Sequence, residues 1–197
     1  MEIINDGSLK ILAPIAEGNV NELENDGINL FDKIALDFFS DLSKSILSDS
    51  EMKAYPELVS FGFFCRNASL NRLSKRYSDK GSYRFGKGVI FHVTPGNVPM
   101  NFAYSLLSGV LSGNVNIVRV PSKNFIEVDL VISKLNATLS NDKYITLSKR
   151  ILIVRYNSNS LWTSFFSKLC DVRLLWGGDK TIDSIRKNEM KASATEI

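Results

Sequence analysis

An asparagine held between two prolines is the first candidate for chemistry in this sequence. Asn97 lies in the segment Pro95-Gly96-Asn97-Val98-Pro99, which follows a short apolar run. The two prolines fix two backbone φ angles and remove two N–H donors, so the loop should be stiff. A stiff loop can aim a carboxamide at a developing negative charge, and Asn97 would then donate to an oxyanion. A capping asparagine in a turn explains the same residues equally well.

Two further loops carry groups that suit an anionic ligand. Arg119 ends an apolar run and is followed by Ser122 and Lys123, which together offer cations and a hydroxyl for a ribose or a phosphate. The segment Gly177-Gly178-Asp179 lets the backbone approach a ligand and leads into a predicted helix, whose N-terminal N–H groups attract anions. Each pattern is common in proteins, so each is weak evidence by itself.

Candidate nucleophiles are scarce. Cys65 lies in an aromatic run, and Cys170 lies in a Leu-Cys-Asp context without a histidine beside it. Thiol activation needs a nearby cation or base, so both are better interpreted as buried structural thiols. The single histidine, His92, lies within an apolar run and is better interpreted as a core residue. A Ser–His–Asp triad is therefore disfavoured, and one histidine with two cysteines gives too few ligands for a zinc site.

The elements that must position these loops begin near residue 88. Short apolar runs bounded by breakers alternate there with helical patterns, which predicts βαβ units. The predicted strands cover 88–94, 116–120, 151–154 and 172–176, and the predicted helices cover 100–112, 126–139, 162–169 and 179–187. This order predicts an α/β fold with an open, doubly wound parallel sheet. Ligands bind such sheets at the carboxyl ends of the strands, where all three loops lie.

The first part of the chain has a different pattern. Three- and four-residue apolar spacing predicts helices at 30–47, 57–64 and 68–77, after a short strand at 9–12. The aromatic run Phe61-Gly62-Phe63-Phe64 is dense, and we expect it to be buried. We therefore predict an N-terminal helical segment over 1–85 and a partial dinucleotide-binding domain over 86–197.

Composition narrows the function classes. The 24 Lys and Arg against 21 Asp and Glu give a net charge of +3, without a basic block, which disfavours a nucleic-acid-binding protein. No segment approaches the ~18 consecutive apolar residues of a membrane helix. The first residues show no signal-peptide pattern. We therefore expect a cytoplasmic protein with neither a nucleic-acid partner nor a membrane span.

Several motifs in combination resemble the aldehyde dehydrogenase superfamily. A P-x-N-x-P loop is followed by a small-residue helix, a Gly-Asn turn and a strand that ends in a base. Within that superfamily the chain is similar to the acyl-CoA reductase family of the bacterial luminescence type, over roughly residues 50 to 190. The segments that carry this similarity are Tyr55-Pro56-Glu57-Leu58, Phe61-Gly62-Phe63-Phe64-Cys65-Arg66, Asn97-Val98-Pro99-Met100-Asn101-Phe102 and Trp176-Gly177-Gly178-Asp179.

The resemblance implies a role for each candidate residue. Asn97 corresponds to the asparagine that binds the oxyanion, and Arg119 takes the place of a lysine that binds the adenosine ribose. Ser122 stands where NAD-preferring members often have a glutamate, and with Lys123 beside it this implies NADPH as the cofactor. The segment Gly177-Gly178-Asp179 falls near the phosphates or the nicotinamide.

The implied reaction converts a fatty acyl thioester, of coenzyme A or of a protein, to a long-chain aldehyde through a cysteine acyl-enzyme. An acyl-protein synthetase partner and a homo-oligomer are implied in the same way. The family's catalytic cysteine lies C-terminal of the Gly177-Gly178 turn, and neither Cys65 nor Cys170 matches it. We therefore expect this chain to be the N-terminal part of such a reductase, inactive alone, with the incomplete parallel sheet of an aldehyde dehydrogenase.

Two other functions compete with this one. The chain could be a non-catalytic α/β module that binds a nucleotide or a partner, without any redox chemistry. A small hydrolase or thiol enzyme that uses Cys65 or Cys170 is disfavoured by the contexts of both thiols.

Overall fold

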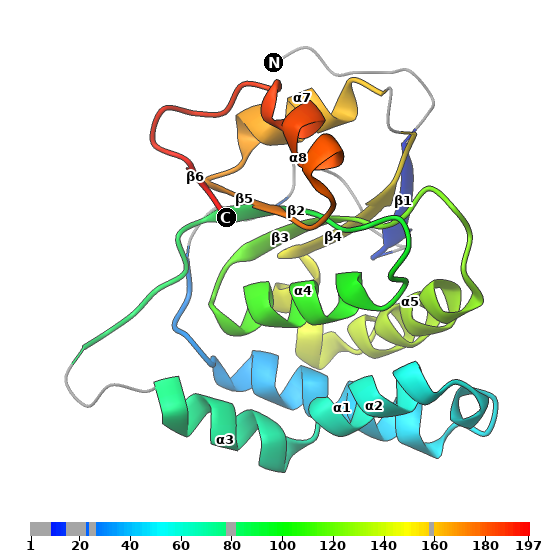
Figure 1. Ribbon diagram of the computed structural model, residues 1–197. Coiled ribbons are helices and arrows are strands. Elements are labelled where there is room, and N and C mark those ends of the chain that lie inside the picture. Colours follow the sequence, from blue (N-terminus) through cyan, green and yellow to red (C-terminus); the bar gives the residue numbers. More distant parts are fainter. Residues whose placement is uncertain (1–8, 15–22, 24–26, 78–81, 158–159) are drawn as a thin grey trace.

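The computed structural model describes residues 9–14, 23, 27–77, 82–157 and 160–197, and its centre is a six-stranded sheet (Figure 1). The strands follow the order β1-β4-β3-β2-β5-β6. All neighbours are parallel except β1, which pairs antiparallel with β4. The strands are β1 (Lys10–Ala13), β2 (Val89–Val93), β3 (Val115–Arg119), β4 (Ile151–Arg155), β5 (Val172–Leu175) and β6 (Thr195–Glu196).

Helices cover both faces of this sheet, as the alternating pattern predicts. Helices α4 (Asn101–Leu111) and α5 (Ile126–Leu139) lie on one face, and α7 (Trp162–Leu169) and α8 (Asp179–Arg186) on the other (Figure 1). A further layer, formed by α1 (Lys33–Ser48), α2 (Pro56–Phe64) and α3 (Asn67–Tyr77), packs beneath α4 and α5. Short helical turns occur at η2 (Met52–Ala54), η3 (Asp142–Tyr144) and α6 (Ile145–Ser148). No helix in the described part of the chain is both long and apolar enough to cross a membrane.

The strand order reverses at β2. Strand β2 pairs with β3 on one side and with β5 on the other, so the chain winds first in one direction and then in the other. Val93 at the end of β2 is in register with Arg119 of β3 and with Leu175 of β5. The carboxyl ends of these three strands therefore meet at one edge, at the switch point where doubly wound sheets bind ligands.

Successive side chains of each strand point into two separate cores, because side chains alternate between the two faces of a sheet. The core toward α7 and α8 contains Phe91, Ile117 and Leu152 from the sheet. The core toward α4 and α5 contains Val118 and neighbours that pack also against α1 and α2. Helix α4 is thus enclosed between the sheet and α1, which explains why it carries apolar residues on nearly all sides. Whether a domain boundary falls near residue 85 stays a prediction.

Helix α4 ends at the predicted glycine. Gly113 follows the C-cap residue Ser112 and has φ 77°, the left-handed conformation that glycine adopts without strain. A Cβ atom at Gly113 would lie 2.1 Å from the carbonyl oxygen of Ile28. Glycine is therefore required here both by the turn and by the segment that passes over it.

A chain of polar side chains crosses the core between β2, β3 and α4. His92 Nε2 lies 3.0 Å from Asn116 Oδ1, and His92 Nδ1 lies 2.7 Å from Ser105 Oγ. The Asn116 amide donates to the Asn114 carbonyl oxygen, which leaves Oδ1 as the acceptor facing the ring. His92 is therefore the Nε2–H tautomer, and Ser105 donates its hydroxyl proton to Nδ1. The prediction of a core histidine is confirmed, and all its polar atoms have partners.

A glycine of α4 leaves the space that these hydrogen-bonded side chains occupy. A Cβ atom at Gly109 would lie 1.9 Å from Asn116 Oδ1 and 2.9 Å from His92 Cε1. Burial lowers the pKa of His92 to about 4, against the weaker opposing effect of its hydrogen bond to Asn116. The imidazole is therefore neutral at physiological pH.

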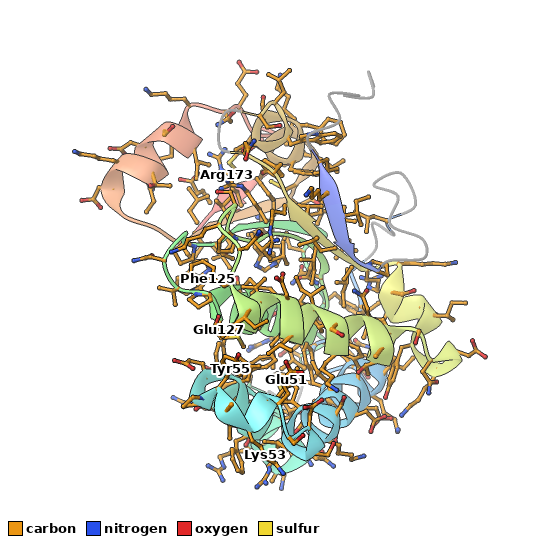
Figure 2. All side chains as sticks on the ribbon, turned by 90° about the vertical axis from the view of Figure 1, so that its right-hand side faces the viewer. Glu51, Lys53, Tyr55, Phe125, Glu127 and Arg173 are labelled. Atoms are coloured by element: carbon orange, nitrogen blue, oxygen red, sulfur yellow. The ribbon has the colours of Figure 1, made fainter. Side chains whose placement is uncertain are left out.

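A buried arginine fixes α8 and β6 to β5. The Arg173 guanidinium donates to the carbonyl oxygen of Asn188 at 2.8 Å and to Ser167 Oγ at 3.0 Å. Its Nε donates to Glu196 Oε2 at 2.9 Å, which compensates the buried charge. Figure 2 shows Arg173 on the sheet, well separated from Phe125 and Glu127 where α5 starts. This network fixes the C-terminal end of α8 and the strand β6 against β5.

Two expectations from the sequence need correction. The aromatic run is only partly buried, because Phe61 points into the core whereas Phe63 and Phe64 are 46% and 39% exposed. A nine-residue helix cannot turn four consecutive side chains toward one neighbour. Strand β3 begins at Val115, one residue before the predicted start, and the two-residue strand β6 was not predicted.

The pH dependence of stability tests the buried imidazole. The folded pKa of about 4 lies below the ordinary value of about 6.5, so the unfolded chain binds more protons between these values. Stability should therefore be fully present above pH 7 and fall by about 2 kcal/mol between pH 7 and pH 5. Urea unfolding at several pH values measures this change.

The matched variant for that experiment is His92→Gln, which keeps a donor and an acceptor but does not titrate. His92 is the only histidine of the chain, so the variant should show a nearly flat profile between pH 7 and pH 5. An equally steep profile in the variant would contradict the assignment.

Candidate nucleotide site at the carboxyl edge of the sheet

The loops after β2 and β3 are joined at their first residues. Thr94 follows β2 and donates its hydroxyl to the carbonyl oxygen of Arg119 at 2.8 Å. The Thr94 backbone N–H reaches the same oxygen at 3.4 Å. The structure thus brings the Asn97 loop and the Arg119 loop together at neighbouring strand ends. Sequence reasoning did not select Thr94, although its position at the end of a predicted strand is the signal that could have found it.

Asn97 is exposed in a turn between β2 and α4. Pro95 and Pro99 on either side of it are partly buried, which holds both ends of the loop. Helix α4 starts four residues later at Asn101, whose side-chain Oδ1 is buried and lacks a hydrogen-bond partner among the described residues. The carboxamide of Asn97 is therefore displayed to solvent by a loop that is fixed on both sides. Its role as an oxyanion donor stays a prediction.

Arg119 is held against an aromatic ring at the end of β3. Its guanidinium carbon lies 4.9 Å from the centroid of Tyr156, and Nη2 lies 3.5 Å from the Tyr156 carbonyl oxygen. Its Nε–H is buried and has no hydrogen-bond partner in the described part of the chain. Tyr156 is itself buried, accepts a hydrogen bond from Thr163 at 3.1 Å, and has its pKa raised to about 12 by burial. Arg119 is thus a positioned cation with an unused donor.

Ser122 and Lys123 lie in the exposed loop between β3 and α5. The Lys123 ammonium is 5.1 Å from the ring centroid of Phe125, the residue directly before α5. The loop is tied to β4 because Arg155 Nη1 donates to Asn124 Oδ1 at 2.7 Å. Ser122 and Lys123 are therefore close to Arg119 along the chain and free to meet a ligand. The loop that follows β4, from Tyr156 on, falls partly outside the described residues, which omit 158 and 159.

The Gly177-Gly178-Asp179 turn is exposed and leads into α8 as predicted. Gly178 has φ −78°, which any residue adopts, so the backbone does not require glycine there. A Cβ atom at Gly178 would meet nothing within 4 Å, and one at Gly177 would touch only Thr181 at 3.5 Å. The glycines leave open space beside the backbone, which fits a ligand that approaches it closely. Asp179, in the first turn of α8, better suits a hydroxyl or amide group than a phosphate.

Trp176 was named in the sequence analysis only as part of a motif, without a role, and Ser105 was missed. Trp176 follows β5, its backbone N–H donates to the Val93 carbonyl oxygen at 2.9 Å, and its indole Nε1–H donates to Ser105 Oγ at 3.2 Å. Trp176 is still 44% exposed. Trp176 thus joins the buried polar chain of His92 to the surface of the site. No motif could have found Ser105, because its partners come from separate strands.

Both thiols lie inside the cores. Cys65 and Cys170 are fully buried. Burial raises the pKa of both, and that of Cys170 reaches about 11. Neither is therefore a thiolate at neutral pH, and the thiol-enzyme hypothesis loses its support.

Comparisons with known proteins identify the family and the fold of this chain. The model of the acyl-CoA reductase (LuxC) family matches residues 63–197. The long-chain acyl-protein thioester reductase of Aliivibrio fischeri is 27% identical over 96 residues, which are 49% of this chain and 20% of that protein. The chain thus matches about a fifth of the length of this curated relative.

Solved structures show the same fold at low sequence identity. Proline utilization A from Bradyrhizobium japonicum superposes with a TM-score of 0.63 at 13% identity, over 83% of this chain and 19% of that one. The NAD-dependent benzaldehyde dehydrogenase from Corynebacterium glutamicum gives 0.55 at 12% identity, over 84% of this chain and 40% of that one. The fold is therefore that of the aldehyde dehydrogenases. Because the family model covers most of its length, the chain belongs to the acyl-CoA reductase (LuxC) family.

Proposed function

We propose that this chain forms the NADPH-binding part of a reductase that converts a long-chain acyl thioester to an aldehyde. The observation that carries the proposal is the joining of the Asn97 loop to the Arg119 loop at the switch point of a sheet in this family. A site for an oxyanion and a site for an adenosine ribose then lie at neighbouring strand ends. The relative named as an acyl-protein thioester reductase supports the substrate class.

The residues present fit a dinucleotide. Arg119 has an unused N–H donor, and the backbone at Gly178 is open to an approaching group. Arg119 would hold the adenosine ribose, and Ser122 and Lys123 would hold a 2′-phosphate. The Gly177-Gly178 turn would lie near the diphosphate or the nicotinamide, with Asp179 toward a hydroxyl or amide group. A carboxylate that binds ribose hydroxyls would repel a 2′-phosphate, and Ser122 is not a carboxylate. The bound cofactor supplies a hydride.

Asn97 would stabilise negative charge on the acyl oxygen. Its side-chain N–H groups are exposed on a loop held at Pro95 and Pro99, and a preorganised donor requires no reorganisation as charge develops.

The sulfur nucleophile must be a thiolate, and the buried Cys65 and Cys170 do not fit that requirement. We therefore place the nucleophile outside these 197 residues, so this chain alone should not turn over substrate. An acyl-protein synthetase partner and a cytoplasmic location belong to the same proposal.

Replacing Arg119 tests the cofactor site. Arg119→Ala should weaken NADPH binding by about tenfold or more, because it removes a charge-assisted donor from a partly buried position. Asn97→Ala is the matched control and should leave the dissociation constant within about twofold. Isothermal titration of the purified chain measures both. Equal affinity in Arg119→Ala and the unmodified chain would remove the cofactor assignment.

Replacing Gly178 tests the open backbone. Gly178→Ala should leave the unfolding midpoint unchanged, because the added methyl meets no protein atom. NADPH affinity should fall by about tenfold if the cofactor fills that space. Thermal unfolding without ligand and a titration with NADPH separate the two effects. Unchanged affinity would place the cofactor away from this turn.

Replacing Lys123 tests the preference for the phosphorylated cofactor. Lys123→Ala should weaken NADPH about fivefold and leave NADH unchanged, because only NADPH carries the 2′-phosphate. Lys53→Ala removes the same charge from the helical layer formed with α1 and α2 (Figure 2) and serves as the control. An equal loss for NADH and NADPH would contradict a phosphate contact at Lys123.

A further inference from the structure

A large aromatic side chain is left exposed at the switch point. Trp176 follows β5 directly, beside the end of β2, and is 44% exposed. The chain's other tryptophan, Trp162, is buried in the core toward α7. Aromatic rings bury much apolar area when they pack, so one displayed at a ligand-binding edge suits a planar partner.

The exposed indole is held in one orientation. Its backbone is paired with Val93, and its Nε1–H donates to Ser105 Oγ. Ser105 is buried on α4, and its hydroxyl proton is directed to His92 Nδ1, so its oxygen is free to accept from the indole. The donors therefore run in one direction, from Trp176 through Ser105 and His92 to Asn116. A ring fixed in this way loses little conformational entropy when a ligand stacks on it.

Strand alternation places Trp176 and Arg119 on opposite faces of the sheet edge. Arg119 has the parity of Ile117, which packs toward α7, and its guanidinium lies over Tyr156 on that side. Trp176 has the parity of Leu174, which is in register with His92, and its indole bonds to α4. A dinucleotide with its adenosine at Arg119 must therefore cross the edge to bring its other end to the side of α4 and the Asn97 loop.

We propose that Trp176 stacks on the nicotinamide ring of the cofactor and that Ser105 is the positioning residue that orients it. This inference rests on the proposed function, because it takes the dinucleotide and the position of its adenosine half from there. The occupant is the nicotinamide because the ring of the adenosine half lies on the opposite face. A planar, polar ring of that size matches one face of an indole.

The experiment compares two ligands that differ in the nicotinamide half. NADPH carries it, whereas 2′,5′-ADP carries only the adenosine half with its 2′-phosphate. Trp176→Leu should weaken NADPH about tenfold and leave 2′,5′-ADP unchanged, and Trp176→Phe, which keeps a ring, should lose about threefold or less. Arg119→Ala should weaken both ligands. Isothermal titration measures all the dissociation constants without relying on fluorescence.

Fluorescence gives an independent readout. In a Trp162→Phe background, Trp176 is the only tryptophan, and NADPH should quench its emission strongly while 2′,5′-ADP should not. Adding Ser105→Ala to this background should lower the anisotropy of Trp176 and weaken NADPH about threefold, because the indole loses its acceptor. Unchanged 2′,5′-ADP affinity in the Trp176 and Ser105 variants serves as the folding reference.

The outcomes separate the two proposals. If NADPH and 2′,5′-ADP both bind and Trp176→Leu leaves both affinities unchanged, the stacking inference is overturned while the cofactor site stands. If Trp176→Leu weakens both ligands equally, the indole contacts the adenosine half or supports the edge, which also overturns the inference. If neither ligand binds the unmodified chain, the proposed function fails and the inference fails with it.

Discussion

An imidazole remains in the interior of an apolar sheet only when both of its ring nitrogens have partners, and the architecture of this protein is arranged around that requirement. His92 of β2 finds one partner on the next strand and one on the covering helix. Gly109 keeps the helix close enough for the second contact. Polar geometry therefore fixes the relative positions of β2, β3 and α4, whereas apolar packing alone would tolerate small shifts between them.

The candidate site is held in place by the same contacts, because its residues end or closely follow the strands of this sheet. Thr94 and Asn97 follow β2, Arg119 ends β3, and Trp176 follows β5. The loops are joined by a hydroxyl–carbonyl bond between the first two strands and by an indole that reaches α4. A shallow, exposed edge can thus present oriented groups without a deep cavity. Such an arrangement suits a long ligand that lies across the edge.

Much of this architecture could be predicted from the sequence. Periodicity and breakers located the strands and helices, and strand-end position identified the loops at Asn97, Arg119 and Gly178. The buried chain could not be predicted, because Ser105, Asn116 and Trp176 are distant in sequence and meet only through tertiary packing. The exposure of Phe63 was also missed, since an aromatic run does not show which of its members face a neighbouring helix. The short strand β6 depends on Arg173 and Glu196, whose pairing no local pattern indicates.

Helix α4 has consequences beyond the site that it opens. Its side chains fill the space toward the sheet and, on the other side, the space toward α1, so almost none of its surface adjoins solvent. A helix that is packed on both sides cannot tilt to accommodate a larger side chain on a neighbouring helix. A larger side chain on α1 would therefore displace α4. That displacement would move the loop before the helix, which carries the Asn97 carboxamide. The outer helices thereby limit how far the loop that carries Asn97 can shift.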